Sequence, residues 1–216
     1  LTRRALLATP AALAAAAPAT PILTNIGLTP ESYIGWPTLA RRAANGQLLL
    51  VYSGGRETHV CPFGRVELMR SNDNGATWSW PEVLMDTVID DRDAGVCETP
   101  AGTILVTTFT SLAYEPILQK AQNWMPDRLA RWQAVQRRST EAQRKALLGT
   151  WMLRSTNGGM TWSAPYRVPV NSPHGPVALS GNHLLYPGKE LWEPGQRARV
   201  AESTDDGQTW RILSDI

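Results

Sequence analysis

The chain contains three copies of one eight-residue pattern, Ser-x-Asp/Asn-x-Gly-x-Thr-Trp, which begin at Ser71, Ser155 and Ser203. Repetition at this scale indicates that the chain is built from repeated supersecondary units, each of which buries its apolar faces against its neighbours. The starts are 84 and 48 residues apart, and the longer interval holds an additional polar, helix-like stretch. The fold must therefore be a repeat architecture with one insertion.

Each copy predicts a tight turn between two strands. The Asp or Asn oxygen accepts hydrogen bonds from backbone N–H groups further along the turn, the glycine supplies a positive φ, and the Ser and Thr hydroxyls close the loop. The tryptophan then opens the next strand and buries a large surface, which fits a composition of 9 Trp against 2 Phe and 5 Tyr. A catalytic or calcium-binding role is the alternative, and we assign three residues to the scaffold instead: Asp73, Asn157 and Asp205.

Strand-like segments precede each turn in the same order. An apolar strand leads into the turn, a Gly-containing hairpin with its own strand comes before that, and one further strand comes first. The first strands are expected at 36–41, 94–99 and 176–179. Four strands per unit, repeated along the chain, are typical of the blades of a β-propeller.

The eight-residue turn is identified as the Asp-box, or BNR repeat, and residues 27–216 resemble the first half of a sialidase-type propeller. The resemblance implies an all-β fold of the six-bladed sialidase type, of which about three blades are present here. It also implies that the chain is part of a longer protein and that this segment alone is inactive. The polar stretch at about 115–148 is predicted as a helical insertion.

One end of the predicted blades collects charged and aromatic connections, whereas the Asp-boxes lie at the other end. At that charged rim, a guanidinium can hold the carboxylate of an acidic sugar while a carboxyl group protonates the leaving oxygen. The catalytic candidates are Glu57 and Asp93. The candidates for substrate binding are Arg56, His59, Arg92, His174 and Glu190. Solvated surface charge is the plainer interpretation of the same residues.

The resemblance to sialidases departs from the family at two places. The aromatic-Arg-Ile-Pro pattern of the family corresponds to the segment around Pro37, where Gly35 stands in the place of the arginine. The acid/base aspartate of the family belongs to the connection that here reads Arg56-Glu57-Thr58-His59. The family's tyrosine nucleophile, its glutamate partner and its other arginines belong to later blades. The expected activity is that of an exo-acting, sialidase-like glycoside hydrolase on a sialic-acid-like or uronic sugar, and the alternative is a non-catalytic propeller that binds glycan or protein partners.

The insertion has apolar residues at Leu129, Trp132 and Val135, and Thr140 with Gln143 forms a potential capping box. Two short helices are therefore expected. The segment 115–148 carries seven basic and three acidic side chains. It is interpreted equally well as a basic flap that attracts an anionic glycan and as a packing or dimer element.

The remaining sequence features concern location and partners. The segment 1–19 combines paired arginines, a short apolar run and an Ala-x-Ala ending, so it is expected to be a signal peptide of the twin-arginine type. Export to the periplasm or the extracellular space follows, with no transmembrane segment. The formal net charge of +2 gives no footprint for nucleic acid. No cofactor or metal is expected, and Cys61 and Cys97 are expected to be free thiols.

Overall fold

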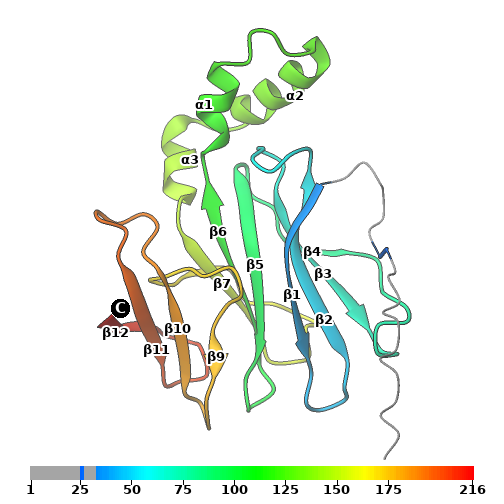
Figure 1. Ribbon diagram of the computed structural model, residues 1–216, viewed down its shortest axis with the longest axis vertical. Helices are drawn as coiled ribbons and strands as arrows, with labels where there is room; N and C mark the ends of the chain where they lie inside the picture. Colours follow the sequence, from blue (N-terminus) through cyan, green and yellow to red (C-terminus); the bar gives the residue numbers. More distant parts are fainter. Residues whose placement is uncertain (1–24, 27–32) are drawn as a thin grey trace, which may run out of the picture.

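The computed structural model describes residues 25–26 and 33–216, which form three four-stranded antiparallel sheets and one helical insertion. The predicted signal peptide, residues 1–19, lies outside the described residues. Each sheet has the strand order of an up-and-down meander, and the sheets stand side by side like blades (Figure 1). The predicted all-β, propeller-like fold is confirmed.

The three sheets divide the chain into consecutive units. The first contains β1 (Tyr33–Arg41), β2 (Leu48–Arg56), β3 (Arg65–Ser71) and β4 (Glu82–Met85). The second contains β5 (Asp90–Glu98), β6 (Ile104–Ser111), β7 (Thr150–Ser155) and β8 (Tyr166–Arg167). The third contains β9 (Val177–Ala178), β10 (Leu184–Lys189), β11 (Ala198–Ser203) and β12 (Arg211–Asp215).

The apolar core lies between neighbouring sheets. On β6, Ile104 and Val106 pack toward the first sheet, whereas Leu105 between them packs toward the third. Successive side chains of a strand point to opposite faces, so a central sheet must be apolar on both sides. The first strands of the three sheets, β1, β5 and β9, lie next to one another (Figure 1).

The Asp-box turns form the hydrogen bonds that their sequence demands. In the first copy the Ser71 hydroxyl donates to Asp73 and accepts from the Gly75 N–H, while Asp73 accepts from both the hydroxyl and the N–H of Thr77. Hydrogen bonds from Thr77 and Ser71 lower the pKa of Asp73 to about 2. In the second copy Asn157 keeps the acceptor oxygen and donates its amide to Thr161. The Asp73 carboxylate and the Asn157 amide therefore make hydrogen bonds within their own turns.

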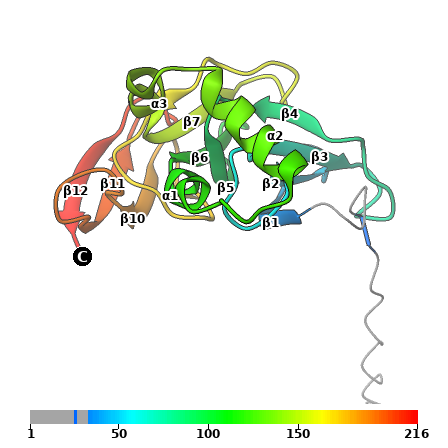
Figure 2. The same cartoon turned by 90° about the horizontal axis from the view of Figure 1, so that it is seen from above.

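The insertion between β6 and β7 forms three helices rather than the expected two: α1 (Tyr114–Gln119), α2 (Pro126–Arg137) and α3 (Glu141–Leu147). A six-residue helix such as α1 is too short to show a clear apolar periodicity. The predicted capping box of Thr140 and Gln143 is present at the start of α3. Figure 2 shows the helices covering one end of the sheets.

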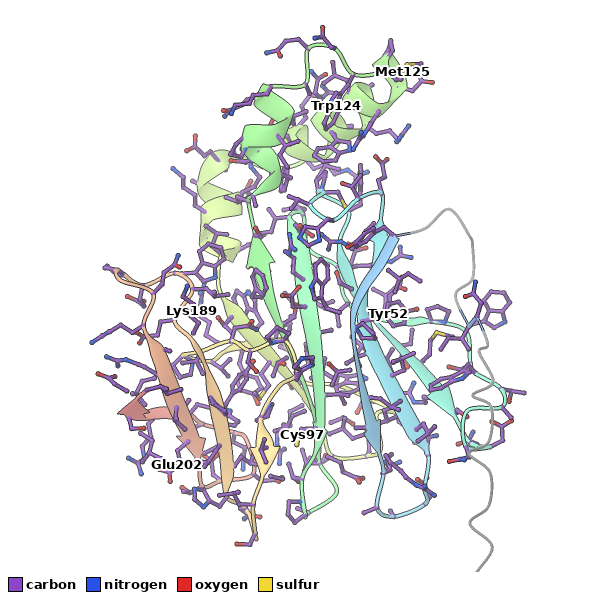
Figure 3. The ribbon with its side chains drawn as sticks, viewed as in Figure 1. Tyr52, Cys97, Trp124, Met125, Lys189 and Glu202 are labelled. Carbon is purple, nitrogen blue, oxygen red and sulfur yellow. The ribbon has the colours of Figure 1, made fainter. Side chains whose placement is uncertain are left out.

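The helices are fixed to the sheets by a separate apolar core. Trp132 of α2 is fully buried among Tyr114, Ile89 and Cys61. Cys97 lies on β5 toward the end away from the helices (Figure 3), and both cysteines are free, as predicted. Figure 3 also shows Trp124 and Met125 at the far tip of the insertion. The insertion is therefore a packed cap on one end of the blades.

The Asp-box serine should be essential to stability because its hydroxyl is buried and doubly bonded. In Ser155→Ala the buried N–H of Gly159 loses its acceptor, so the free energy of unfolding should fall by about 1–3 kcal/mol. Chemical denaturation measures the change. The matched control is Thr156→Ala, an exposed neighbour, which should stay within about 0.5 kcal/mol of the parent. Equal effects of the two substitutions would contradict this account of the turn.

Candidate functional site

Two inner strands carry a backbone irregularity at corresponding positions. The pairing of β1 with β2 shifts between Gly35 and Thr38, and the pairing of β5 with β6 shifts between Arg92 and Gly95. Trp36 and Asp93 lie inside these shifts with φ values of 52° and 42°. Non-glycine residues with positive φ are strained, and such strain is concentrated at functional sites. From the sequence the first strands are expected to begin at 36 and 94, whereas β1 begins at Tyr33 and β5 at Asp90, so both irregularities lie in the first halves of these strands.

Side chains from both irregularities meet in one group, which we call the rim cluster: Trp36, His59, Arg92 and Asp93. The Arg92 guanidinium carbon is 4.8 Å from the centroid of the Trp36 ring, and the His59 and Trp36 ring centroids are 4.9 Å apart. Arg92 Nη2 lies 3.5 Å from His59 Nε2, and Arg92 Nε lies 4.0 Å from Asp93 Oδ1. The cluster lies at the end of the blades that carries the helices, because β1 and β5 both begin there (Figure 1).

Asp93 is the chemically distinctive member of the rim cluster. Burial raises the pKa of its carboxyl group, and the positive charges of Arg92, Arg56, His59 and His174 oppose that rise without cancelling it. Its Oδ1 is buried and has no hydrogen-bond partner, and the same is true of the Nε of Arg92 that faces it. Such a carboxyl group can hold a proton and deliver it to a bound group.

Aromatic rings extend the rim cluster on two sides. Arg92 lies 5.8 Å from the Phe109 ring, and Trp192, which is 43% exposed, is 6.5 Å from Phe109 between ring centroids. On the other side the Tyr33 hydroxyl is 3.2 Å from His59 Nδ1. Exposed aromatic rims around a few polar groups are common in small-molecule sites.

Arg56 lies beneath this group rather than in it. Its guanidinium is 2.7 Å and 2.9 Å from the two carboxylate oxygens of Asp90, and both side chains are 0% exposed. It also donates to Ser53 and to the carbonyl oxygen of His59. In this arrangement Arg56 positions the backbone that carries His59 and has no surface to offer a substrate.

The two glutamates singled out from the sequence are held away from the rim cluster. Glu57 accepts hydrogen bonds from Arg131 at 2.7 Å and from the Trp132 indole at 3.1 Å, so it fastens α2 to the blade. Glu190 is ion-paired with Arg197 and Arg199 in the connection between β10 and β11. Both carboxylates are committed to holding connections in place.

His174 lies close to the rim cluster because the segment that contains it packs directly against Gly95 of β5. A Cβ atom on Gly95 would lie 2.4 Å from the nitrogen of Gly175 and 2.7 Å from the carbonyl carbon of His174, so only glycine permits this approach. The exposed imidazole is near enough for its charge to act on Asp93. The structure thus brings together Asp93, Arg92, His59 and His174 from the sequence-predicted set.

Sequence reasoning did not identify Trp36 and Phe109 as site residues. Their only signal was the high tryptophan content and the place of Trp36 in a rim segment, because nothing in the sequence reveals a register shift. Within residues 25–26 and 33–216, no three His, Cys, Asp or Glu side chains gather closely enough to hold a metal ion. In the same part of the chain, none of the helices combines the length and apolarity needed to span a bilayer.

Asp91, next to the rim cluster in sequence, is a separate buried acid. It is fully buried and accepts hydrogen bonds from the N–H of Thr87 at 2.6 Å and from the Thr87 hydroxyl at 3.0 Å. Burial raises its pKa to about 8, because these hydrogen bonds do not compensate for the loss of water around the charge. Its protonation belongs to folding rather than to the site.

No protein-family model matches the chain, and no curated protein matches it in sequence. Solved structures do match the fold. A Hadza microbial sialidase, Hz136, superposes with a TM-score of 0.60 at 19% identity over 84% of this chain and 37% of its own. The NanB sialidase of Streptococcus pneumoniae gives 0.53 at 13% identity over 91% of this chain and 46% of its own.

A protein of unknown function from Dyadobacter fermentans gives a TM-score of 0.59 at 17% identity, over 86% of this chain and 55% of its own. The chain therefore spans about half or less of the length of these structures. At such identities the likeness concerns the fold: the three sheets are similar to part of a sialidase propeller.

The buried acid Asp91 should make stability depend on pH. Its pKa is raised from 3.8 to about 8 on folding, so between these values the folded protein binds more protons than the unfolded chain. Its stabilising contribution is complete below about pH 4 and is lost as the pH rises through about 8. Asp91→Asn, the neutral isostere, should make the melting temperature less dependent on pH between about pH 4 and pH 8. An unchanged slope in the variant would show that Asp91 does not titrate there.

Proposed function

We propose that the protein is a sialidase-like glycoside hydrolase that acts on a terminal acidic sugar, sialic-acid-like or uronic, with the rim cluster as part of its active site. One observation carries the proposal. Arg92 Nε and Asp93 Oδ1 are 4.0 Å apart, buried and without hydrogen-bond partners, on a strained backbone at the mouth of the blades. The likeness of the fold to sialidases and the resemblance in the Asp-boxes support it.

In this proposal Asp93 is the general acid. Burial raises its pKa and so favours the protonated form, and the carboxyl O–H would give its proton to the glycosidic oxygen as the bond from the sugar carbon to that oxygen breaks. The leaving group departs as a neutral alcohol, and a water molecule adds to the sugar carbon and loses a proton, which completes the hydrolysis. The carboxylate that remains is stabilised by the guanidinium of Arg92, and His59 and His174 add positive charge when they are protonated.

The other members of the site would bind and orient the sugar. Arg92 would donate to the substrate carboxylate from its guanidinium, whose Nε–H has no acceptor among the described residues and is buried, so the side chain must turn outward to bind. The rings of Trp36, Phe109 and Trp192 provide apolar faces for the C–H surface of a sugar. Arg56, Glu57 and Glu190 would act indirectly, by holding the connections that frame the site.

A second candidate function is glycan binding without catalysis. It is favoured by Gly35, which stands where the resembling family has an arginine, and by Glu57, whose carboxylate is engaged by α2. A binding module would use the same aromatic rim and Arg92 but would not need a protonated Asp93. Export of the protein, proposed from the paired arginines of segment 1–19, suits both functions.

Replacement of the proposed acid separates these candidates. Asp93→Asn removes the transferable proton, so hydrolysis of an alkyl glycoside of an acidic sugar should slow by about 10²–10⁴-fold in kcat with little change in KM. The loss should be smaller for an activated nitrophenyl leaving group, which needs no proton, than for an alkyl glycoside.

The matched control for this substitution is Asp127→Asn, an exposed acid at the start of α2, which should leave kcat unchanged. Equal losses for both leaving groups would exclude Asp93 as the proton donor. These assays use the full-length protein that contains this segment, and binding of the sugar without any turnover by that parent protein would establish the non-catalytic function instead.

A further inference from the structure

A second cavity lies on the outer side of the connection between β2 and β3. It has a volume of about 330 Å³, within the range of small-ligand sites. Its walls come from that connection, from the segment before β5 and from α2. The lining residues used below are Glu57, Phe63, Arg65, Asp86, Arg131 and Arg138. The cavity shares no lining residue with the rim cluster.

The cavity concentrates guanidinium groups of differing availability. Arg131 is bound to Glu57 at 2.7 Å, and Arg65 is bound to Glu67 at 2.5 Å. Arg138 is exposed, and no hydrogen bond or ion pair engages its guanidinium among the described residues. Among the described residues, the cavity therefore presents one guanidinium without a partner, that of Arg138, beside two that are each paired with a glutamate.

Other residues of the cavity lining supply an acceptor and an apolar surface. Asp86 is exposed and makes no ion pair within the described part of the chain. Phe63, Val88 and Val135 provide the apolar wall. A lining that combines aromatic and aliphatic groups with a guanidinium and a carboxylate that are unpaired among the described residues matches a saccharide, whose hydroxyl groups donate to carboxylates and whose ring stacks on apolar groups.

Contacts within the protein hold one wall of the cavity in place. Phe63 packs edge-on against the buried Trp132 at 6.2 Å between ring centroids, and Trp132 also donates to Glu57. A Cβ on Gly55, which has a φ of 68°, would come within 2.9 Å of the Phe63 carbonyl oxygen, so this wall tolerates no larger residue. A rigid wall lowers the entropic cost of binding.

We propose that this cavity is an accessory binding site for an acidic saccharide unit of the uronic type. The sugar carboxylate binds Arg138, with Arg131 and Arg65 adding positive charge, and ring hydroxyls donate to Asp86. A simple inorganic anion is not the preferred ligand, because it has no ring face for Phe63, Val88 and Val135 to contact. This site does not depend on the proposed catalytic function of the rim cluster.

Methyl NMR tests the proposal locally. Val88 and Val135 line the cavity and are not part of the rim cluster, so their methyl signals report ligands bound there. The probes are glucuronate, glucose and inorganic phosphate, titrated into the protein. Glucuronate should shift both signals saturably and at lower concentration than glucose or phosphate. Arg138→Gln should weaken glucuronate binding by about tenfold, the effect of losing one charge-assisted hydrogen bond.

Three further variants make the outcome decisive. Arg137→Gln, the adjacent exposed arginine that does not line the cavity, should bind glucuronate like the parent. Asp86→Ala, which removes the acceptor of the ring hydroxyl groups, should weaken it, and Asp93→Asn should not, which separates this site from the rim cluster. Absence of saturable shifts, equal binding by Arg138→Gln and Arg137→Gln, or a preference for phosphate would each overturn the proposal.

Discussion

The buried ion pair between Arg56 and Asp90 is the contact on which the rim depends. It joins the end of β2 to the start of β5, and both side chains are 0% exposed. A Cβ on Gly64 would lie 2.1 Å from Asp90 Oδ1 and 2.2 Å from Arg56 Nη1, so the surrounding backbone is fitted closely to the pair. Removal of either partner would leave an uncompensated buried charge, which is strongly destabilising. Both charges are therefore fixed as structural elements, and the first two blades are locked together at the end where the helices sit.

This lock explains how a strained site is maintained beside it. Arg56 also holds the carbonyl oxygen of His59, so the imidazole is delivered to Trp36 and Arg92 by a backbone that cannot relax. Trp36 and Asp93 keep positive φ values because the strands on both sides of each shift remain paired. Both arginines pair with Asp90: Arg56 binds both of its carboxylate oxygens, and Arg92 Nη1 lies 3.5 Å from Oδ2. Arg92 differs in that its Nε faces Asp93 Oδ1, and neither atom has a hydrogen-bond partner among the described residues.

The blades could be predicted from the sequence, whereas the composition of the site could be predicted only in part. The Asp-box repeats specify turns through local hydrogen bonds between residues two to four positions apart, and local interactions of this kind are legible in a sequence. The partner of Arg56, Asp90, is 34 residues away, whereas sequence reasoning singled out Asp93 and assigned Arg56 to substrate binding. Which carboxylate faces inward depends on a register shift between Arg92 and Gly95, and a shift of one residue reverses the direction of a strand side chain. Arg56 and Glu57 are adjacent in sequence, yet Arg56 binds Asp90 of β5 and Glu57 binds Arg131 and Trp132 of α2.

The helical insertion packs against the connection between β2 and β3 and forms the outer cavity together with it. A basic flap and a packing element were equally compatible with its charge, and the full burial of Trp132 together with the contact of Glu57 to α2 shows that it is packed. Its arginines therefore act from fixed positions instead of closing over a ligand. Residues 57–63 form a thin wall with His59 turned toward the rim cluster and Phe63 turned toward the outer cavity. Because Glu57 and Arg56 clamp this wall from its two sides, a ligand in either place meets a surface that is already rigid, and the two sites can be tuned by separate substitutions.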